Sequence, residues 1–409
     1  MTTAALREPG TYTNEASSPT NAAVSTRGRI GSLDIVRGVV MLLMAIDHVR
    51  VYSGQPAGGP TPGIFFTRWV THFVAPAFVF LAGTGAFMYG ARVNDKRKLS
   101  RFLLTRGLWL VLLELTVLRV AWTFNFDFAH YMLAGVIWMI GWCMVLMAGI
   151  VFLPQIAIAA GGVAVIVGHN ISNVLPAVRG LSEASPAWLW KILYFGGVVN
   201  LGENGPPLFI LFVIIPWIGV MAAGYAFGRV MQMPSERRRA ICLRLGVVCI
   251  AAFIVLRALD VYGDPRPWSK SPMPALLAFL NATKYPASLS FLLMTLGPMF
   301  VLLALVDKAS GPFARILATF GRVPFFYYVL HIPTIHVAAC IVSLVREGSV
   351  NPWLFTNHPV APGQLPDGYR WSLVLLYVVW AIVVVALYFP CRWFAKLKAQ
   401  KRSAWLSYL

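Results

Sequence analysis

The hydrophobic pattern of this chain is a succession of long apolar runs separated by short polar segments. About ten of these runs have the length of a membrane-spanning helix, which needs about 20 mostly apolar residues to cross a bilayer. They cover residues 33–53, 68–91, 101–121, 130–152, 155–174, 206–230, 239–258, 286–306, 322–345 and 371–391. Within each helix the backbone polar groups would bond to one another, as a lipid environment requires. The pattern therefore predicts an all-α, polytopic helical membrane protein with about ten transmembrane helices.

The charge pattern orients these helices. The chain is 58% hydrophobic and 12% charged, with a net charge of +19. Its basic residues cluster beside the apolar runs, at 27–29, 92–101, 237–239 and 392–402. Cytoplasmic loops are enriched in Lys and Arg, and such clusters also attract anionic lipid headgroups. We therefore assign the charge to a lipid bilayer and not to nucleic acid. Both termini are expected in the cytoplasm, with the plasma (inner) membrane as the location if the source is bacterial.

Asp34, Arg37 and His48, three of the ionisable residues of the first apolar run, lie on one face of a helix. At about 100° per residue, Arg37 and His48 differ by about 20° around a helix, Asp34 and His48 differ by about 40°, and His48 lies about 16 Å along the axis from Arg37. Ionisable groups on one intramembrane face usually point into a protein interior or a wet cavity. Arg37 near the cytoplasmic face would bind phosphate through its guanidinium or anchor the helix at lipid headgroups. His48 near the outer end would act as a base or as an interfacial hydrogen-bonding residue.

Glu114 and His331 are also ionisable residues within apolar runs. Glu114 would either pair with Arg119 or Arg106 or orient a catalytic imidazole. His331 would either hydrogen-bond a neighbouring span or contribute to the site.

The expected outer level holds further candidates. His72 lies beside Arg68 at the start of the second span, as an interfacial residue or as a base. Lys284 and Tyr285 would form an acceptor site at the outer mouth or anchor the interface. Gly83 and Gly85, together with Ala82 and Ala86, are expected to allow close helix packing. No pair of His or Cys residues has ligand spacing on one helix face, so no metal site is predicted.

Several fragments, taken in order, carry a resemblance to a known family. They are Ser32–Gly38 (SLDIVRG), Asp47–Arg50 (DHVR), Phe66–His72 (FTRWVTH), Ala75–Gly83 (APAFVFLAG), Lys284–Pro286 (KYP), Leu296–Pro298 (LGP) and Phe320–His331 (FGRVPFFYYVLH). An Arg and a His separated by ten residues resemble the first helix of transmembrane acyltransferases. Together, the fragments resemble the heparan-alpha-glucosaminide N-acetyltransferase-like family over roughly residues 29–391.

The resemblance implies transfer of an acetyl group from cytoplasmic acetyl-CoA, or of an acyl group from a longer acyl-CoA, to a hydroxyl or amine on the far side of the membrane. In the eukaryotic enzyme the acceptor is the terminal glucosamine of heparan sulfate, and the catalytic histidine lies in the loop between the first two spans. Here the corresponding loop, Gly54–Thr67, contains no histidine. The catalytic role would therefore pass to His48 or His72.

Under this hypothesis the chain is a membrane acyltransferase, and its acyl group moves either directly or through an acyl-imidazole intermediate. The catalytic candidates are His48, Glu114, His72 and His331, and the candidates for cofactor binding are Asp34, Arg37, Arg322, Lys284 and Tyr285. The expected partners are acyl-CoA and an outer-face acceptor such as a carbohydrate, and a homo-oligomer is left open. The domains would be a disordered cytoplasmic tail (1–29), a single transmembrane acyltransferase-like domain (30–396) and a basic cytoplasmic tail (397–409).

Two other classes of function compete with this hypothesis. Buried charges and histidines also form the proton relays and substrate paths of transporters and flippases. A non-catalytic relative that keeps only the scaffold is the third alternative, and it is motivated by the missing loop histidine. Turnover of CoA thioesters separates the first class from the other two.

Overall fold

A computed structural model describes residues 31–59, 61–173, 180, 187–202, 205–359 and 365–400. The residues from Gly31 onward form one compact unit. The predicted N-terminal tail, residues 1–29, lies outside the described residues, as do residues 401–409 of the predicted C-terminal tail. Residues 397–400 continue the last helix.

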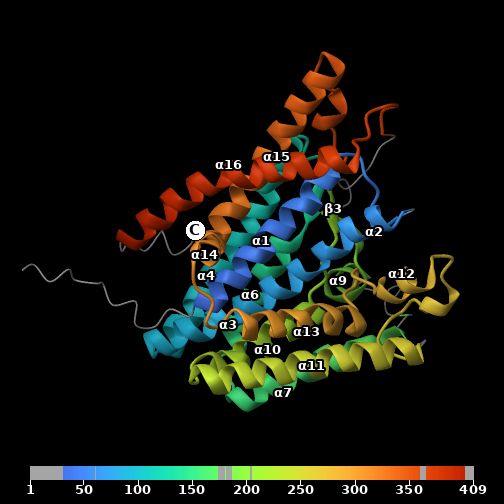
Figure 1. Cartoon of the computed structure of the whole chain (residues 1–409). Coiled ribbons are helices and arrows are strands. Elements are labelled where there is room, and N and C mark those ends of the chain that lie inside the picture. The colour runs from blue at the N-terminus through green and yellow to red at the C-terminus, as the bar shows by residue number, and fades with distance from the viewer. Residues whose placement is uncertain are drawn as a thin grey trace, which may run out of the picture. The chain divides into compact units, whose positions relative to one another are not determined.

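An α-helix lies over each of the ten predicted spans (Figure 1). These helices are α1 (Gly31–Tyr52), α3 (Val74–Val93), α4 (Lys96–Leu113), α6 (Val136–Ile150), α7 (Gln155–Gly168), α10 (Ile215–Met231), α11 (Ser235–Leu259), α13 (Leu289–Leu305), α15 (Pro324–Glu347) and α16 (Leu373–Gln400). Polar residues between the apolar runs end and begin them. Asn94 ends α3 in the left-handed conformation, and the Asp95 carboxylate accepts a hydrogen bond of 2.8 Å from the Arg97 backbone N–H at the start of α4.

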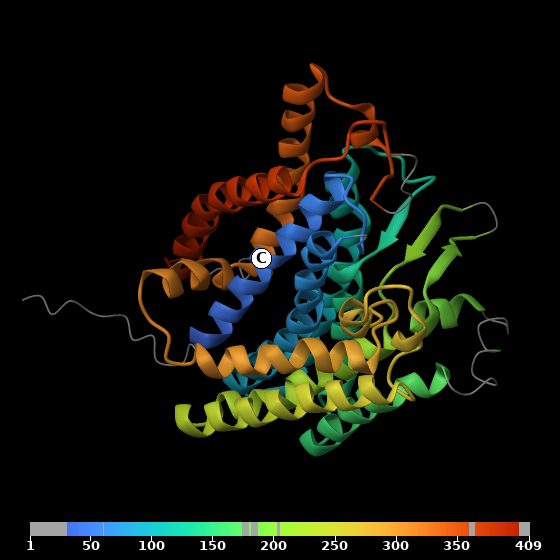
Figure 2. The same cartoon turned by 45° about the vertical axis from the view of Figure 1, so that its right-hand side comes forward.

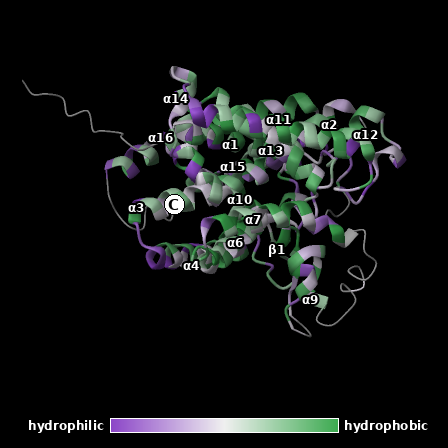
Figure 3. Ribbon diagram, turned by 90° about the horizontal axis from the view of Figure 1, so that it is seen from below, coloured by the Kyte–Doolittle hydropathy of each residue, from purple (hydrophilic) through white to green (hydrophobic). Residues whose placement is uncertain are grey.

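Length and apolar composition show which of the described helical segments could cross a membrane. Four are both long and apolar enough: Pro62–Val93, Ser235–Leu259, Pro324–Glu347 and Leu373–Gln400. The first of these joins α2 (Pro62–Trp69) to α3 through the short helix η1 (Val70–Phe73). Figure 3 shows hydrophobic residues along most of the helices and hydrophilic residues at the beginning of α4. The chain is therefore a mostly helical integral membrane protein, whereas the number of spans and the orientation of its termini stay predictions.

A small β-sheet departs from the all-α prediction. It consists of β1 (Met132–Ala134), β2 (Gly197–Asn200) and β3 (Pro207–Ile210) in the order β1–β3–β2, with β1 parallel and β2 antiparallel to β3 (Figure 2). Strands β1 and β3 lie at the beginning of two predicted spans, 130–152 and 206–230. The apolar pattern did not predict these strands because a short continuous apolar run is compatible with either a strand or a helix.

Helix α1 lies among other helices, and two glycines set its closest contact. Helix α14 (Pro312–Arg322), which the apolar pattern did not predict, packs along α1. A Cβ at Gly38 would overlap the backbone carbonyl of Leu317, and a Cβ at Gly321 would overlap that of Asp34. Because glycine has no side chain, the two backbones approach directly. Helices α3, α15 and α16 also contact α1. The face of α1 that carries Asp34, Arg37 and His48 therefore lies against other helices of the protein.

The same device holds α3 against α10. A Cβ at Gly83 would overlap the backbone carbonyl of Met221, and a Cβ at Gly224 would overlap that of Phe80. The predicted close helix packing is therefore confirmed at Gly83, whereas a Cβ at Gly85 would meet only the Arg37 guanidinium, at 3.5 Å. The side-by-side arrangement of α10, α7, α11 and α13 completes this part of the unit (Figure 1).

Candidate functional site

His48 and His331 meet at the centre of the candidate site. Helix α1 carries His48 and α15 carries His331, and Nδ1 of His48 lies 2.6 Å from Nε2 of His331. The two rings are stacked, with centroids 4.8 Å apart. Trp122 contacts the His48 ring edge-on at 4.7 Å. His331 is fully buried and His48 is half-buried, so the pair presents His48 toward accessible space.

The hydrogen bonds of this pair determine the tautomer of each neutral imidazole. Nδ1 of His331 lies 2.6 Å from the carbonyl oxygen of Tyr328, so it carries the proton and donates it. Nε2 of His331 is then an acceptor, and Nδ1 of His48 must donate to it. This leaves the lone pair of His48 on Nε2, which has no hydrogen-bond partner among the described residues. A half-buried imidazole with a fixed, unoccupied Nε2 can accept a proton from a substrate.

A charged cluster lies next to this pair on the same helix. The two carboxylate oxygens of Asp47 accept from Arg50 Nε at 2.9 Å and from Arg68 Nη1 at 3.0 Å. The Arg50 guanidinium also donates to the Gln55 carbonyl oxygen at 2.8 Å, and Arg68 donates to the Thr71 hydroxyl at 3.1 Å. Both arginines are buried. The cluster therefore ties α1 to α2 and places Arg68 between the histidine pair and the pocket described next.

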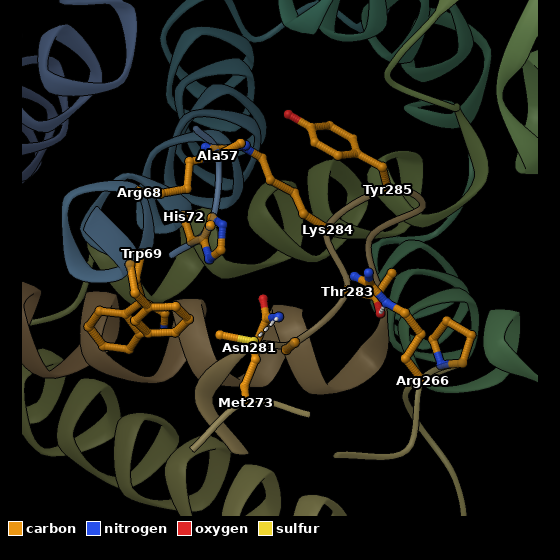
Figure 4. Close-up of a pocket in the computed structure, with 14 residues that line it drawn as sticks. Ala57, Arg68, Trp69, His72, Arg266, Met273, Asn281, Thr283, Lys284 and Tyr285 are labelled. Atoms are coloured by element: carbon orange, nitrogen blue, oxygen red, sulfur yellow. Dashed lines mark hydrogen bonds between the residues drawn. The ribbon is translucent and has the colours of Figure 1, made fainter. Parts of the chain in front are cut away.

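A pocket of about 570 Å³ opens beside Arg68 (Figure 4). Its lining comprises Ala57, Gly58, Phe65, Arg68, Trp69, His72, Pro265, Arg266, Met273, Asn281, Ala282, Thr283, Lys284 and Tyr285. The walls come from α2, from η1 and from the segment that precedes α13. A volume of this size accepts a small polar molecule. The pocket brings His72 together with Lys284 and Tyr285, which the sequence analysis predicted as a separate acceptor site, although His48 is not part of its lining.

Lys284 and His72 have unusual surroundings within this pocket. The Lys284 ammonium lies over the rings of Tyr285 and Phe212, at 5.2 Å and 5.8 Å from their centroids. Burial, followed by the charge of the Arg68 guanidinium, lowers the pKa of Lys284. His72 is buried with its ring edge against Phe291, and its Nδ1 has no partner in the described part of the chain. Tyr285 is more than one-third exposed.

Glu114 forms its hydrogen bond with the N-terminus of α6 and not with either histidine of the pair. Its carboxylate accepts a hydrogen bond of 3.0 Å from the backbone N–H of Ile137, in the first turn of α6. A Cβ at Gly135 would lie 2.5 Å from the Glu114 carboxylate, so glycine makes room for it. An anion at a helix N-terminus satisfies free N–H groups and complements the helix dipole. The contacts of Glu114 thus cap α6, and its role toward an imidazole stays a prediction.

Asp34, Arg37 and Arg322 lie at the other end of α1 from His48. Arg37 Nη1 lies 3.5 Å from the Asp34 carboxylate, and Nη2 donates to the Leu81 carbonyl oxygen at 3.4 Å. Asp34 is buried, and the Arg37 side chain is 22% exposed. Arg322 ends α14 and is exposed, next to the glycine that abuts Asp34. The cationic side chains of Arg37 and Arg322 therefore lie at the same end of α1.

Three residues of the site were missed as candidates by the sequence reasoning: Asp47, Arg50 and Arg68. Asp47 and Arg50 belong to the fragment DHVR that carries part of the family resemblance. Their presence inside an apolar run was the signal that could have identified them. Arg68 was noted only as the neighbour of His72, and its pairing with Asp47 depends on the packing of α2 against α1.

Comparison with known proteins identifies the family. The family model described as heparan-alpha-glucosaminide N-acetyltransferase, catalytic, matches residues 29–262, which is more than half of the 409 residues. The match contains His48, Asp47, Arg68 and Glu114 and ends before Lys284. No curated protein matches the chain. Because the match covers more than half of the chain and the whole of α1, the chain belongs to the heparan-alpha-glucosaminide N-acetyltransferase catalytic family.

Proposed function

We propose that this protein is a membrane acetyltransferase that uses acetyl-CoA, or another acyl-CoA, to modify a hydroxyl or amine of a carbohydrate-type acceptor. The observation that carries the proposal is the fixed tautomer of His48, whose Nε2 keeps a lone pair at the accessible side of the pair. Membership of an N-acetyltransferase family supports the reaction type. The helical, apolar architecture supports a reaction that joins the two sides of a membrane.

The chemistry assigns a separate task to each histidine. His48 Nε2 removes the proton from the acceptor hydroxyl or amine as the oxygen or nitrogen attacks the thioester carbonyl. The C–S bond then breaks, the new ester or amide bond forms, and the proton returns to the CoA thiolate. In the alternative route, Nε2 itself attacks and an acetyl-imidazole carries the group to the acceptor. In both routes His331 holds His48 in the productive tautomer.

The donor end is the opposite end of α1. Arg37 and Arg322 supply guanidinium groups for the phosphates of CoA, which guanidinium binds in a bidentate manner. Asp34 orients Arg37, with the two groups 3.5 Å apart. An extended pantetheine arm suits the separation of about 16 Å between Arg37 and His48 along α1. Placement of Arg37 at the cytoplasmic face follows from the predicted topology.

The acceptor end consists of the pocket lined by His72, Lys284 and Tyr285. The predicted topology, with both termini in the cytoplasm, puts this pocket at the outer face of the plasma (inner) membrane if the source is bacterial. His72 is the second candidate for the base, because its Nδ1 is buried without a partner in the described structure. Glu114 supports the site by capping α6.

The test uses the purified full-length protein in lipid nanodiscs with acetyl-CoA and a panel of hexoses and hexosamines. Free CoA thiol is measured over time, and the acetylated product is measured by mass spectrometry. His48→Ala should lower the rate by about 10²- to 10⁴-fold, the usual contribution of a general base. His72→Ala decides between the two candidate bases. His130→Ala is the matched control, because the His130 side chain is 81% exposed and lies outside the site.

Each result has a consequence. Loss of CoA release in His48→Ala, with an unchanged rate in the control, supports the assignment. An unchanged rate in His48→Ala overturns it. Intact acetyl-CoA across the whole panel overturns the enzymatic proposal and favours a transporter or a non-catalytic relative.

A further inference from the structure

Trp122 covers part of the His48 ring. It lies near the end of α5 (Arg119–Thr123), and the centroids of the indole and the imidazole are 4.7 Å apart in a T-shaped contact. His331 stacks on the same imidazole at 4.8 Å. Because Trp122 is buried, it closes its side of His48 with a large apolar ring. Solvent and substrate reach only the remaining part of the imidazole.

Two tyrosines hold Trp122 in this position. The Tyr52 hydroxyl donates to the Trp122 carbonyl oxygen at 2.7 Å, and the two rings stack with centroids 5.8 Å apart. The Tyr369 hydroxyl donates in turn to the Tyr52 carbonyl oxygen at 2.9 Å. Both tyrosines are buried, so water does not compete for these hydrogen bonds. They form a continuous connection from the segment before α16 to Trp122.

Residues 367–371, which we call the strap, attach this connection to α1. The Trp371 backbone N–H donates to the Ser53 carbonyl oxygen at 3.0 Å, directly after the end of α1. The Gln55 side-chain amide donates to the Trp371 carbonyl oxygen at 2.6 Å. The strap therefore holds Tyr369 against the end of the helix that carries His48.

The backbone directly after Trp122 is strained. Phe124 has a φ of +49°, in the left-handed region that bulky residues rarely adopt. Its ring stacks on His336 with centroids 3.8 Å apart, and the Arg119 guanidinium donates to the Thr123 hydroxyl at 2.8 Å. Strained residues persist only where the surrounding structure holds them, and they cluster at functional sites. The whole fold, and not local preference, therefore sets the position of Trp122.

Water competes with the acceptor in the reaction proposed above. When water attacks the thioester carbonyl, its oxygen bonds to the acetyl carbon and the C–S bond breaks. One proton of the water passes to the CoA thiolate and the other to solvent, so acetate and CoA leave without transfer. Enzymes prevent such hydrolysis by excluding water from the site. A buried indole packed against the imidazole is suited to this task.

We propose that Trp122 shields His48 from water and so directs the acyl group to the acceptor, and that Tyr52 and Tyr369 are the residues that position it. This inference rests on the proposed function for the reaction that is protected, and it adds the residue that sets the ratio of transfer to hydrolysis. Trp122 takes no proton, because its indole N–H is a donor only. It acts by filling the volume beside His48.

The first measurement is independent of catalysis. The full-length protein in nanodiscs is treated at about neutral pH with diethyl pyrocarbonate, which modifies accessible, unprotonated histidine nitrogens. Mass spectrometry compares the rate at His48 with that at His130, whose side chain is 81% exposed. Trp122→Ala should raise the relative rate at His48 at least about tenfold, because it removes the ring that excludes solvent. Tyr52→Phe should raise it about two- to tenfold, the effect of one hydrogen bond.

The second measurement is the ratio of CoA release without acceptor to acetyl transfer with acceptor. It should rise at least about tenfold in Trp122→Ala, and Trp122→Phe should restore most of the difference because an aromatic ring remains. Tyr52→Phe, which keeps the indole, carries the same test if Trp122→Ala does not fold. Tyr131→Phe is the matched control, because this buried hydroxyl has no hydrogen-bond partner in the described part of the chain. Both measurements should match the wild type.

Three outcomes would overturn the inference. The first is an unchanged rate at His48 in both Trp122→Ala and Tyr52→Phe. The second is faster modification with an unchanged ratio of hydrolysis to transfer in a protein that turns over acetyl-CoA. The third is equal acceleration in Tyr131→Phe, which would assign the effect to general loosening. Faster modification in Trp122→Ala, in a protein whose wild type leaves acetyl-CoA intact, would support the shield and contradict the acyl-transfer proposal alone.

Discussion

Replacing His331 by Phe tests how much the histidine pair contributes to catalysis. The ring of Phe keeps the stacking against Tyr327, whose centroid lies 5.3 Å from that of His331. It removes Nε2, the acceptor for Nδ1 of His48 at 2.6 Å. The proton of His48 is then free to occupy either nitrogen, and in one of the two tautomers Nε2 no longer has a lone pair.

The magnitude follows from the hydrogen bond that is lost. A buried donor left without its partner costs about 1–3 kcal/mol. If this cost falls on the catalytic tautomer, it lowers kcat by roughly 5- to 150-fold, because about 1.4 kcal/mol corresponds to a factor of ten. His331→Gln should recover most of the rate, since its amide oxygen can accept from His48. KM for acetyl-CoA should change little in either variant, because His331 is fully buried.

The assay is CoA release by the full-length protein in nanodiscs, with kcat and KM determined separately. His336→Phe is the matched control, because His336 lies on the same helix and is equally buried but contacts Phe124 in place of His48. A kcat in His331→Phe equal to that of the wild type would refute the tautomer argument. Equal losses in His331→Phe and His336→Phe, accompanied by lower melting temperatures, would reduce the role of His331 to packing.

Three further predictions concern stability and donor binding. Gly321→Ala should lower the free energy of unfolding by about 1–3 kcal/mol, because its methyl group overlaps a backbone carbonyl of α1; thermal unfolding in detergent measures this. Asp307→Ala should cost about 2–3 kcal/mol, because it leaves Arg238 without the carboxylate that lies 2.8 Å away. Burial raises the pKa of Asp307, but hydrogen bonds and charge from Arg238 outweigh it and lower the pKa, so this stabilisation is complete above about pH 3.9 and is lost as the pH falls through the lowered value. Arg37→Gln should raise KM for acetyl-CoA about tenfold with little change in kcat, measured by CoA release.

Each of these has a matched control. Gly149→Ala lies in a helix with open space around the new methyl group and should leave the melting temperature unchanged or raise it. Lys308→Ala removes an exposed ion pair next to Asp307 and should cost less than about 1 kcal/mol. Arg101→Gln, an exposed cation of α4, should leave KM unchanged. A melting temperature unchanged in Gly321→Ala or in Asp307→Ala, or a KM unchanged in Arg37→Gln, would contradict the corresponding prediction.

The apolar pattern by itself determined where most helices lie. A run of about 20 apolar residues can satisfy its backbone in lipid only by coiling into a helix, and a helix lies over part or all of each of the ten predicted spans. The spacing of Arg37 and His48 also depends only on helix geometry, since α1 is continuous from Gly31 to Tyr52. Family membership follows from the order of short fragments and is confirmed over residues 29–262.

Amphipathic and short elements escaped the apolar pattern. Helix α14 alternates exposed residues such as Phe313 with a face that packs on α1, so it has no continuous apolar run. Strand β1 lies within an apolar run that is equally compatible with a helix. Its pairing with β3 is a contact between distant segments that no local signal records.

The tertiary structure alone decided which side chains meet. His48 and His331 are 283 residues apart, and their hydrogen bond requires α1 and α15 to pack with those two faces together. The same holds for Asp47 with Arg68 and for the pocket that joins Arg68 to Lys284. Helix period places a residue on a face, but the partner of that face is set by packing of the whole unit, where small residues such as Gly38 and Gly321 allow backbones to touch. The sequence thus named His48 as a candidate, and the fold supplied the neighbour that fixes its proton.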